Sequence, residues 1–236
     1  MIWLIVVILF LYFVWQQVSK PSASLFGEVI WRGPDSEKKI TLTFDDGPNP
    51  LATPLILKIL KEENIKATFF VIGSNAKKYP DLLKEMVKDG HEIEVHSWHH
   101  YPLFFLSSPR RQFRELLETK EVIKRIVGET PQLFRPPWGN RTPWLLAQAK
   151  KLQLKTVTWS VDPWDAWLLP TEDRIIRRFT QRLHNGAIIL LHDGAGRRLE
   201  PRTATVMALA RIIEIAKQKN FRFATLRELI GIVSEV

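Results

Sequence analysis

The chain has 236 residues, of which 45% are hydrophobic and 25% charged, so it can bury the core of a folded domain and is not a disordered protein. It contains no cysteine, which excludes disulfide bonds and any site built on a thiolate. The net charge of +9 suits a polyanionic neighbourhood or plain solubility, but no nucleic-acid-binding motif is present and we expect no nucleic acid as a partner.

The first segment, from Met1 to Val18, is apolar and carries no charged side chain. A membrane-spanning helix needs about 17 to 25 such residues, and a cleaved signal peptide usually begins with basic residues that are missing here. We therefore expect residues 1–19 to form a transmembrane anchor, with a cleaved signal peptide or a soluble core helix as alternatives. Lys20 and Arg32 follow the run, so the positive-inside rule taken alone would place the following domain on the inner side of the membrane.

Residues 20–38 are rich in Pro, Ser and Gly and are expected to form a linker, and residues 39–236 are expected to form the main domain. In this domain short apolar runs alternate with longer amphipathic ones, which indicates alternating strands and helices. The expected strands are residues 39–44, 67–72, 92–95, 132–134, 156–161, 187–191 and 221–224. The expected helices lie near residues 54–63, 80–89, 109–127, 143–151, 172–184, 201–219 and 226–233.

The ends of the expected helices carry the usual capping residues. Thr53, Ser108 and Thr142 each precede a proline, as an N-cap precedes the first helical residue, and Thr225 with Glu228 forms a capping box. Seven strand–helix alternations with nearly continuous apolar strands favour a parallel sheet. We predict an α/β fold, a distorted (β/α) barrel of about seven parallel strands, behind the N-terminal membrane helix.

Polar clusters follow five of the expected strands, at the end of a βα barrel where active sites lie. Each cluster also has a simpler explanation: Asp-Gly-Pro is a common turn, histidines four apart are often exposed, and the others resemble rigid turns or helix entries. These explanations do not predict that all five clusters share one rim. The clusters are Asp45-Asp46, His96 to His100, Arg135 to Gly139, Asp162 to Asp165 and His192-Asp193.

The first two clusters together predict a metal site. One carboxylate with His96 and His100 would provide three ligands for a divalent ion and leave room for water, while the second carboxylate would be free to act on that water. His99 lies outside this pair and can equally be solvated. The pattern indicates a metal-dependent hydrolase.

The five clusters, in their order along the chain, resemble the five motifs of the polysaccharide deacetylase family, also called the NodB homology domain or carbohydrate esterase family 4. The resemblance spans about residues 38 to 232. The matching segments are Thr43-Phe44-Asp45-Asp46-Gly47-Pro48, His96-Ser97-Trp98-His99-His100, Arg135-Pro136-Pro137-Trp138-Gly139, Asp162-Pro163-Trp164-Asp165 and Leu190-Leu191-His192-Asp193.

The resemblance implies a role for residues in each motif. It makes Asp46, His96 and His100 the metal ligands, Asp45 the general base and His192 the general acid. The implied cofactor is one divalent ion, usually zinc, with Co²⁺, Mn²⁺ and Ni²⁺ as alternatives. The resemblance further assigns pKa tuning to Arg135 and Asp165, oxyanion stabilisation to the backbone N–H of Trp138, and substrate contacts to Pro137 and Leu190. The tryptophans that border the motifs are expected to offer apolar faces to sugar rings, with core packing as the rival explanation for any one of them: Trp98, Trp138, Trp164 and Trp167.

One residue departs from the family pattern. The family usually has Trp directly after the fourth-motif Asp, whereas here Ala166 takes that place and Trp167 follows. Either the indole reaches the same pocket from one residue later, or the pocket is more open.

The expected function is removal of N-acetyl groups from an N-acetylglucosamine polymer, peptidoglycan or a chitin-like glycan, with release of acetate. The alternatives are an O-acetyl xylan esterase, a metal amidohydrolase for a non-sugar amide, and an inactive carbohydrate-binding module. Because the family's substrates are mostly extracytoplasmic polymers, we expect the protein to be anchored in a bacterial membrane with its domain outside, or to be secreted after signal cleavage. We also expect it to be a monomer.

Overall fold

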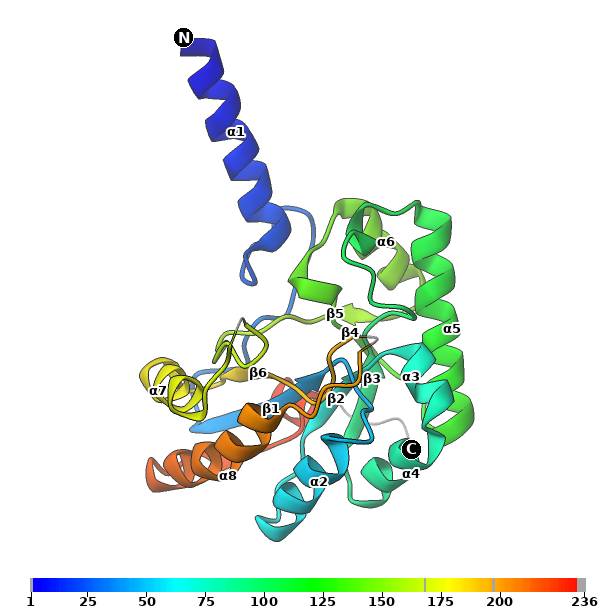
Figure 1. Ribbon diagram of the computed structural model, residues 1–236. Helices are drawn as coiled ribbons and strands as arrows, with labels where there is room; N and C mark the ends of the chain where they lie inside the picture. The colour runs from blue at the N-terminus through cyan, green and yellow to red at the C-terminus, as the bar shows by residue number, and fades with distance from the viewer. Residues whose placement is uncertain (1, 168, 197, 233–236) are drawn as a thin grey trace.

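The computed structural model describes residues 2–167, 169–196 and 198–232, and its centre is a sheet of seven parallel strands (Figure 1). The strands follow the order β5-β4-β3-β2-β1-β6, and β7 pairs with the first two residues of β1. Six of the seven strands lie where the sequence predicts them, and β5 shares only Thr156 with the predicted strand 156–161. Their bounds are β1 Lys39–Asp45, β2 Thr68–Val71, β3 Glu92–Val95, β4 Leu133–Phe134, β5 Lys155–Thr156, β6 Ile188–His192 and β7 Arg222–Phe223.

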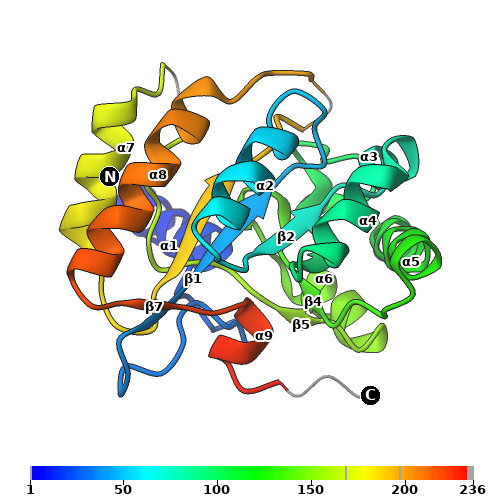
Figure 2. The same cartoon turned by 90° about the horizontal axis from the view of Figure 1, so that it is seen from below.

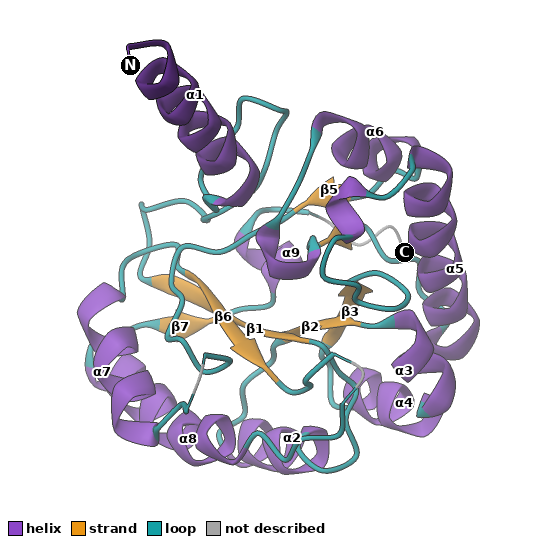
Figure 3. Cartoon of the chain, turned by 45° about the horizontal axis from the view of Figure 1, so that its top comes forward, coloured by secondary structure: helices purple, strands orange, loops and turns teal. Residues whose placement is uncertain are grey.

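Helices α2 to α8 pack around the outside of the curved sheet (Figures 2 and 3). Residues on both faces of β6 are buried, which explains why its sequence, Ile-Ile-Leu-Leu-His, is almost continuously apolar. The helices are α1 Ile2–Ser19, α2 Thr53–Glu62, α3 Gly73–Lys78, α4 Pro80–Lys88, α5 Pro109–Val127, α6 Pro143–Lys151, α7 Glu172–Arg182, α8 Thr203–Gln218 and α9 Leu226–Leu229, with 3₁₀ turns η1 Phe104–Leu106 and η2 Pro137–Gly139.

The predicted distorted barrel is confirmed, and its distortion lies between β5 and β6, the two ends of the strand order. No continuous ladder joins them among the described residues. Instead Val161, beyond the end of β5, forms an isolated parallel bridge with Ile189, and its carbonyl accepts from the N–H of Leu190 at 2.9 Å. The irregular segment after β5 is therefore free to form one wall of a cleft.

The caps agree with the predictions except at α2. Ser108, Thr142 and Thr225 each accept a backbone N–H at the start of their helix. The N-cap of α2 is Ala52, because the hydroxyl of Thr53 instead donates to Asp193 at 2.5 Å. The sequence analysis does not predict helix α3, because this helix has only six residues and most of them are polar.

Helix α1 projects from the domain (Figure 1) and is long and apolar enough to cross a membrane, with a mean hydropathy of 2.0 and only 6% of its residues buried. Its last turn reaches the domain, where Val18 is buried in the core. Residues 20–38 lie along the domain surface, and Ile30 forms a bridge with Val157 while the N–H of Gly33 donates to Gly186 at 2.8 Å.

Candidate active site

The first and fifth clusters meet at the ends of two neighbouring strands. Asp45 is the last residue of β1 and lies directly beside His192, the last residue of β6, in the parallel register. Asp46 follows with φ 75°, a left-handed conformation that non-glycine residues rarely adopt. This backbone turn places Asp45 and Asp46 at the same end of the sheet.

The turn after β1 is fixed by the segment after β6. The N–H groups of Asp193 and Gly194 both donate to the carbonyl of Asp45 at 3.2 Å. A β-carbon at Gly47 would lie 2.0 Å from the Asp193 carboxylate, and one at Gly194 would lie 2.1 Å from the carbonyl of Asp46. Gly47 leaves room for the buried Asp193 side chain, and Gly194 is needed because two backbone segments approach closely there.

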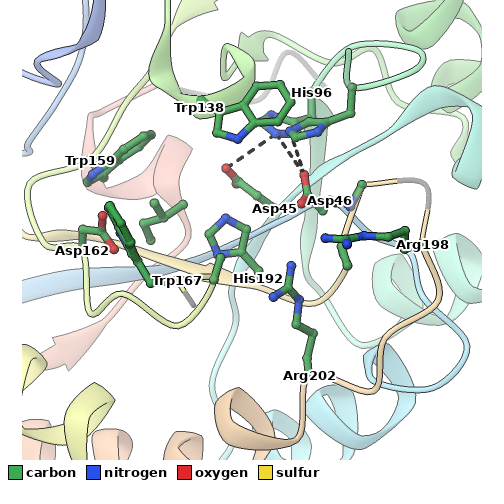
Figure 4. A pocket seen from close by; sticks show the side chains of 15 residues that line it. Asp45, Asp46, His96, Trp138, Trp159, Asp162, Trp167, His192, Arg198 and Arg202 are labelled. Carbon is green, nitrogen blue, oxygen red and sulfur yellow. Dashed lines mark hydrogen bonds and ion pairs between the residues drawn. The ribbon is translucent and has the colours of Figure 1, made fainter. Parts of the chain in front are cut away.

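Three predicted ligands converge at one point. One ligand atom from each of Asp46, His96 and His100 lies within 4.8 Å of the other two. Asp46 Oδ1 is 3.3 Å from His96 Nε2 and 3.1 Å from His100 Nε2 (Figure 4). The histidines lie in a loop after β3, with φ 100° at Ser97 and 55° at His100, so their convergence does not depend on helical spacing.

The surroundings of these three residues fit a divalent ion. Asp46 Oδ1 is buried and receives no hydrogen bond from the described residues. The Nδ1–H of His96 donates to the carbonyl of Arg135 at 2.8 Å, which leaves the Nε2 lone pair free as a ligand. Burial lowers the pKa of His100 to about 4, so its imidazole is neutral at physiological pH, the form that binds metal.

The pKa of Asp46 is held below its usual range. Burial alone would raise it, but the neighbouring imidazoles of His100, His96 and His192 favour the ionised carboxylate more strongly. A buried carboxylate beside two imidazoles is the donor set of a three-ligand zinc-type site.

The predicted base is held by a buried arginine. Asp45 is 3% exposed, and its Oδ1 accepts from Arg135 Nη1 at 2.8 Å. Arg135 is fully buried, donates also to Thr43 and to the carbonyl of Thr158, and stacks over the ring of Phe70 at 4.2 Å. Burial lowers the pKa of Arg135, and Asp45 opposes this shift. Asp45 Oδ2 is left beside the ligand cluster, 3.8 Å from His96 Nε2.

The predicted acid is paired with Asp165. The Nδ1–H of His192 donates to Asp165 Oδ1 at 2.8 Å, and the backbone N–H of His192 and the hydroxyl of Thr205 donate to Oδ2 at 2.8 and 2.9 Å. Burial alone would lower the pKa of His192, but the Asp165 carboxylate overcomes this and raises it to about 9. His192 is therefore protonated at neutral pH.

These residues line one cleft of about 500 Å³ (Figure 4). Trp138, in η2 with φ 54°, packs its indole against His100 with ring centres 4.2 Å apart, while Leu190 lies on the wall beside His192. Trp167 lines the cleft as well, so the indole does reach the pocket from one residue later than the family pattern. Ala166 beside it leaves that part of the wall without a large side chain.

The remaining predicted contact residues lie outside the cleft lining. Trp98 packs on α3, where a β-carbon at Gly73 would lie 2.4 Å from its ring. The ring centres of Trp164 and Trp167 lie 5.4 Å apart. The guanidinium of Arg178 lies over the ring of Trp164. Pro137 is buried within η2.

Four lining residues with large or charged side chains carry no role in the sequence analysis. Trp159 and Asp162 come from the irregular segment after β5, and Arg198 and Arg202 come from the loop between β6 and α8. Asp162 stands within the fourth motif, which is the one signal that pointed to it. The two arginines have no local pattern, and the Nε–H of Arg202 reaches the site by donating to the carbonyl of Gly194 at 2.5 Å.

The chain is similar to known proteins over most of its length. The polysaccharide deacetylase family profile matches residues 32–157. The peptidoglycan-N-acetylglucosamine deacetylase of Bacillus cereus is 38% identical over 206 residues, which cover 86% of this chain and 93% of that protein.

Solved structures share the fold as well. The Bc1960 peptidoglycan N-acetylglucosamine deacetylase superposes with a TM-score of 0.80 at 33% identity, covering 88% of this chain and 95% of that one. A carbohydrate esterase family 4 pseudoenzyme from Bacillus anthracis superposes with a TM-score of 0.78 at 29% identity, covering 86% and 68% of the two chains. The fold alone thus does not guarantee activity, and the residues of the site must carry that argument.

The family profile and the relative's identity and coverage agree with the five motifs and with the parallel sheet that brings them to one rim. The chain belongs to the polysaccharide deacetylase family, the hydrolases of carbohydrate esterase family 4.

Proposed function

We propose that this protein is a metal-dependent deacetylase that hydrolyses the N-acetyl groups of an N-acetylglucosamine polymer, with peptidoglycan as the leading substrate. The observation that carries the proposal is the grouping of Asp46, His96 and His100 within 4.8 Å, with Asp45 beside them and His192 on the next strand. An inactive binding module would not need a free carboxylate and a protonated imidazole beside a ligand cluster.

Asp46, His96 and His100 would hold the divalent ion. When bound, it would act as a Lewis acid and lower the pKa of a water molecule in the site. His96 is kept in the ligand tautomer by the carbonyl of Arg135, and neutral His100 needs no deprotonation before it binds.

Asp45 would take the proton from the attacking water. Arg135 fixes its Oδ1, so that Oδ2 faces the ligand cluster and is the oxygen available to accept a proton. Asp46 cannot share this role, because a carboxylate bound to an ion is no longer a free base. The backbone N–H of Trp138, at the rim of the cleft, is the proposed donor to the oxyanion of the acetamide carbonyl.

His192 would complete the reaction on the opposite side of the cleft. As the carbonyl carbon–nitrogen bond breaks, the nitrogen must gain a proton, since an amide anion is a very poor leaving group. His192 is protonated at neutral pH, and Asp165 occupies its Nδ1, so Nε2 is the atom that donates. Leu190 would contact the methyl of the acetyl group, and the indoles of Trp138 and Trp167 would face the sugar rings.

The protonated state of His192 also favours an amide over an ester as substrate. An alkoxide leaving group depends less on a proton donor than an amine does. We therefore expect His192→Ala to lower acetate release from N-acetylglucosamine oligomers much more than from O-acetylated xylan. Similar losses on both substrates would contradict the proposed N-acetyl preference.

The N-terminal helix and the peptidoglycan deacetylases among the relatives support an extracytoplasmic location, with α1 as a membrane anchor, residues 20–38 as its connection and residues 39–236 as the catalytic domain. We propose that the enzyme acts as a monomer. The carbohydrate substrate would reach the cleft from the outer side of the membrane.

Acetate release from a panel of acetylated glycans tests this proposal. The purified protein should release acetate from N-acetylglucosamine oligomers and from peptidoglycan, lose this activity with a chelator and regain it with divalent ions. Release only from a small non-sugar amide, or from none of the panel, would overturn it.

A further inference from the structure

The end of α1 is capped by a buried arginine from the domain. Arg141 is 1% exposed, and its guanidinium donates to the carbonyls of Val18, Lys20 and Ala23 at 3.3, 2.5 and 2.7 Å. The last carbonyls of a helix lack partners within the helix, and a cation there also interacts favourably with the helix dipole. Arg141 thus attaches the C-terminal end of α1 to the domain.

The same arginine connects this helix end to the rim of the cleft. Its Nη1 also donates to the carbonyl of Gly139 at 2.8 Å, and its backbone N–H donates to Val18 at 3.1 Å. Gly139 belongs to η2, the turn that holds Trp138 against His100. The end of α1 and the active-site rim are therefore parts of one bonded unit.

A second connection runs from the residues after α1 to the base. The hydroxyl of Thr158 donates to the carbonyl of Pro21 at 2.9 Å, and the carbonyl of Thr158 accepts from Arg135 at 2.9 Å. Arg135 in turn holds Asp45. Val18 is buried in the core. The residues directly after α1 are therefore hydrogen-bonded to the segment that holds Arg135 and, through it, Asp45.

The sequence of α1 places the membrane surface close to these contacts. The apolar run ends at Trp15, the polar residues Gln16 and Gln17 follow, and the first charge is Lys20. The helix has 18 residues, and a rise of about 1.5 Å per residue gives about 27 Å, close to the ~30 Å of a bilayer's hydrocarbon core. The headgroup region would therefore begin within one turn of the Arg141 contacts.

We propose that α1 and Arg141 hold the cleft at the level of the lipid headgroups, so that the enzyme acts on a glycan carried by a membrane lipid rather than on glycan far out in the wall. This inference rests on the proposed function and on α1 crossing the membrane. Trp138 and Trp144, which are 48% and 43% exposed on either side of Arg141, would lie at the interface, where tryptophan is enriched.

Depth measurements test the geometry without any need for activity. The chain has no cysteine, so a single fluorescent probe can be attached to Trp144→Cys near Arg141 or to Met207→Cys on α8. Helix α8 lies on the side of the sheet away from α1 (Figures 1 and 2). In vesicles with a headgroup-bound quencher, we expect strong quenching at position 144 and little at 207. Equal quenching, or none at 144, would overturn the proposal.

A linker insertion tests the substrate. About 20 Gly and Ser residues after Ser19 would let the domain move roughly 25 Å from the membrane, whereas the same insertion at the turn between Glu63 and Asn64 serves as the control. The probe substrates are an N-acetylglucosamine oligomer attached to a lipid in the same vesicle and the same oligomer free in solution.

The wild type and the control should prefer the lipid-linked oligomer by about tenfold or more, because the rigid attachment raises its effective concentration. The insertion after Ser19 should lose most of this preference while its activity on the free oligomer stays the same. An unchanged preference in that variant, or none in the wild type, would overturn the inference. Absence of acetate release from both oligomers by the wild type would instead reject the proposed function, and the depth measurements would still decide the geometry.

Discussion

Two clusters of buried charge lie at the two ends of β3. Glu92, Glu94 and the following His96 are alternate residues, so their side chains point to the same face. At the start of the strand Arg227 of α9 lies 3.3 Å from Glu92 and 3.5 Å from Glu94, and a further 3.2 Å contact joins it to Glu129. At the other end His96 joins the ligand cluster of the cleft.

The two clusters differ in how their charges are satisfied. Glu94 also accepts the N–H groups of Gln132 and Leu133 at 2.9 and 2.8 Å, so it fastens the start of β4 to β3. Glu94 Oε1 and Asp46 Oδ1 both lack a hydrogen-bond donor among the described residues, but Glu94 Oε1 faces the Arg227 guanidinium at 3.5 Å, whereas Asp46 Oδ1 faces the imidazole nitrogens of the cleft. Buried charge therefore indicates function only where it leaves unsatisfied ligand atoms facing a cavity. Where opposite charges and backbone groups pair, it stabilises the fold.

The largest expected effect comes from the cleft cluster. Asp45→Asn should lower kcat by about 10²- to 10⁴-fold, because the amide cannot accept the proton from water. The metal content should stay close to that of the wild type, since the ligands are unchanged, whereas the melting temperature should fall, because the buried Arg135 loses its counter-charge. Steady-state kinetics with elemental analysis would check this. Full turnover in the variant would show that Asp45 is not the base.

The α9 cluster should give the opposite result. Arg227→Met leaves Glu94 buried without its cation, and burial already raises the pKa of Glu94 to about 8, so protonation of this carboxyl would relieve part of the cost. The variant should lose about 1–3 kcal/mol of stability, with little change in kcat at a temperature where it is folded. Urea denaturation measures the loss. The control Arg222→Met removes an exposed ion pair to Glu37 and should cost less than about 1 kcal/mol. Equal losses in the two variants would contradict the comparison.

The role of His192 as the general acid can be tested through the pH dependence of activity. His192 carries its proton below a pKa of about 9, so activity that needs this proton is present at neutral pH and is lost as the pH rises through that value. Asp165→Asn removes the carboxylate that raises the pKa, and the alkaline loss should move towards the ordinary histidine value of about 6.5. Asp162→Asn, which changes a cleft carboxylate that is not bonded to His192, should leave the alkaline limb nearly in place. A pH profile unaffected by Asp165→Asn would argue against His192 as the acid.

The smallest effect is expected at the rim. Trp167→Ala should raise KM for N-acetylglucosamine oligomers by about two- to tenfold, the loss of one aromatic contact, with kcat nearly unchanged. Met207→Ala, an exposed change on α8, should alter neither constant. If Trp167→Ala lowers kcat as Asp45→Asn does, the indole has a role beyond contact with the sugar.

The sequence predicts the fold well where the hydrophobic periodicity and the capping residues indicate the same helix ends. Helices α5 and α6 begin and end at the predicted residues, because Ser108 and Thr142 cap them and a proline fills the first position. The prediction is weaker where tertiary contacts replace local signals. Strand β5 is shorter than expected, since its continuation leaves the ladder and returns only at Val161 to pair with Ile189.

The candidate site follows the same rule. The residues predicted as ligands, base and acid converge, because Asp45, Asp46, His96 and His192 end or directly follow strands of one parallel sheet and the loop after β3 brings His100 to the same point. Arg202 was missed because it reaches the cleft from a long loop with no periodic pattern. Trp98 stands within a motif, but its ring packs on Gly73, which sequence spacing alone cannot predict.

The metal content of the purified protein tests the central claim most directly. We expect one divalent ion per chain in the wild type and in Asp162→Ala, which changes a carboxylate of the same cleft, and loss of the ion in Asp46→Ala and His100→Ala. A wild type that binds no divalent ion, or an Asp46→Ala variant that keeps the full complement, would contradict the account.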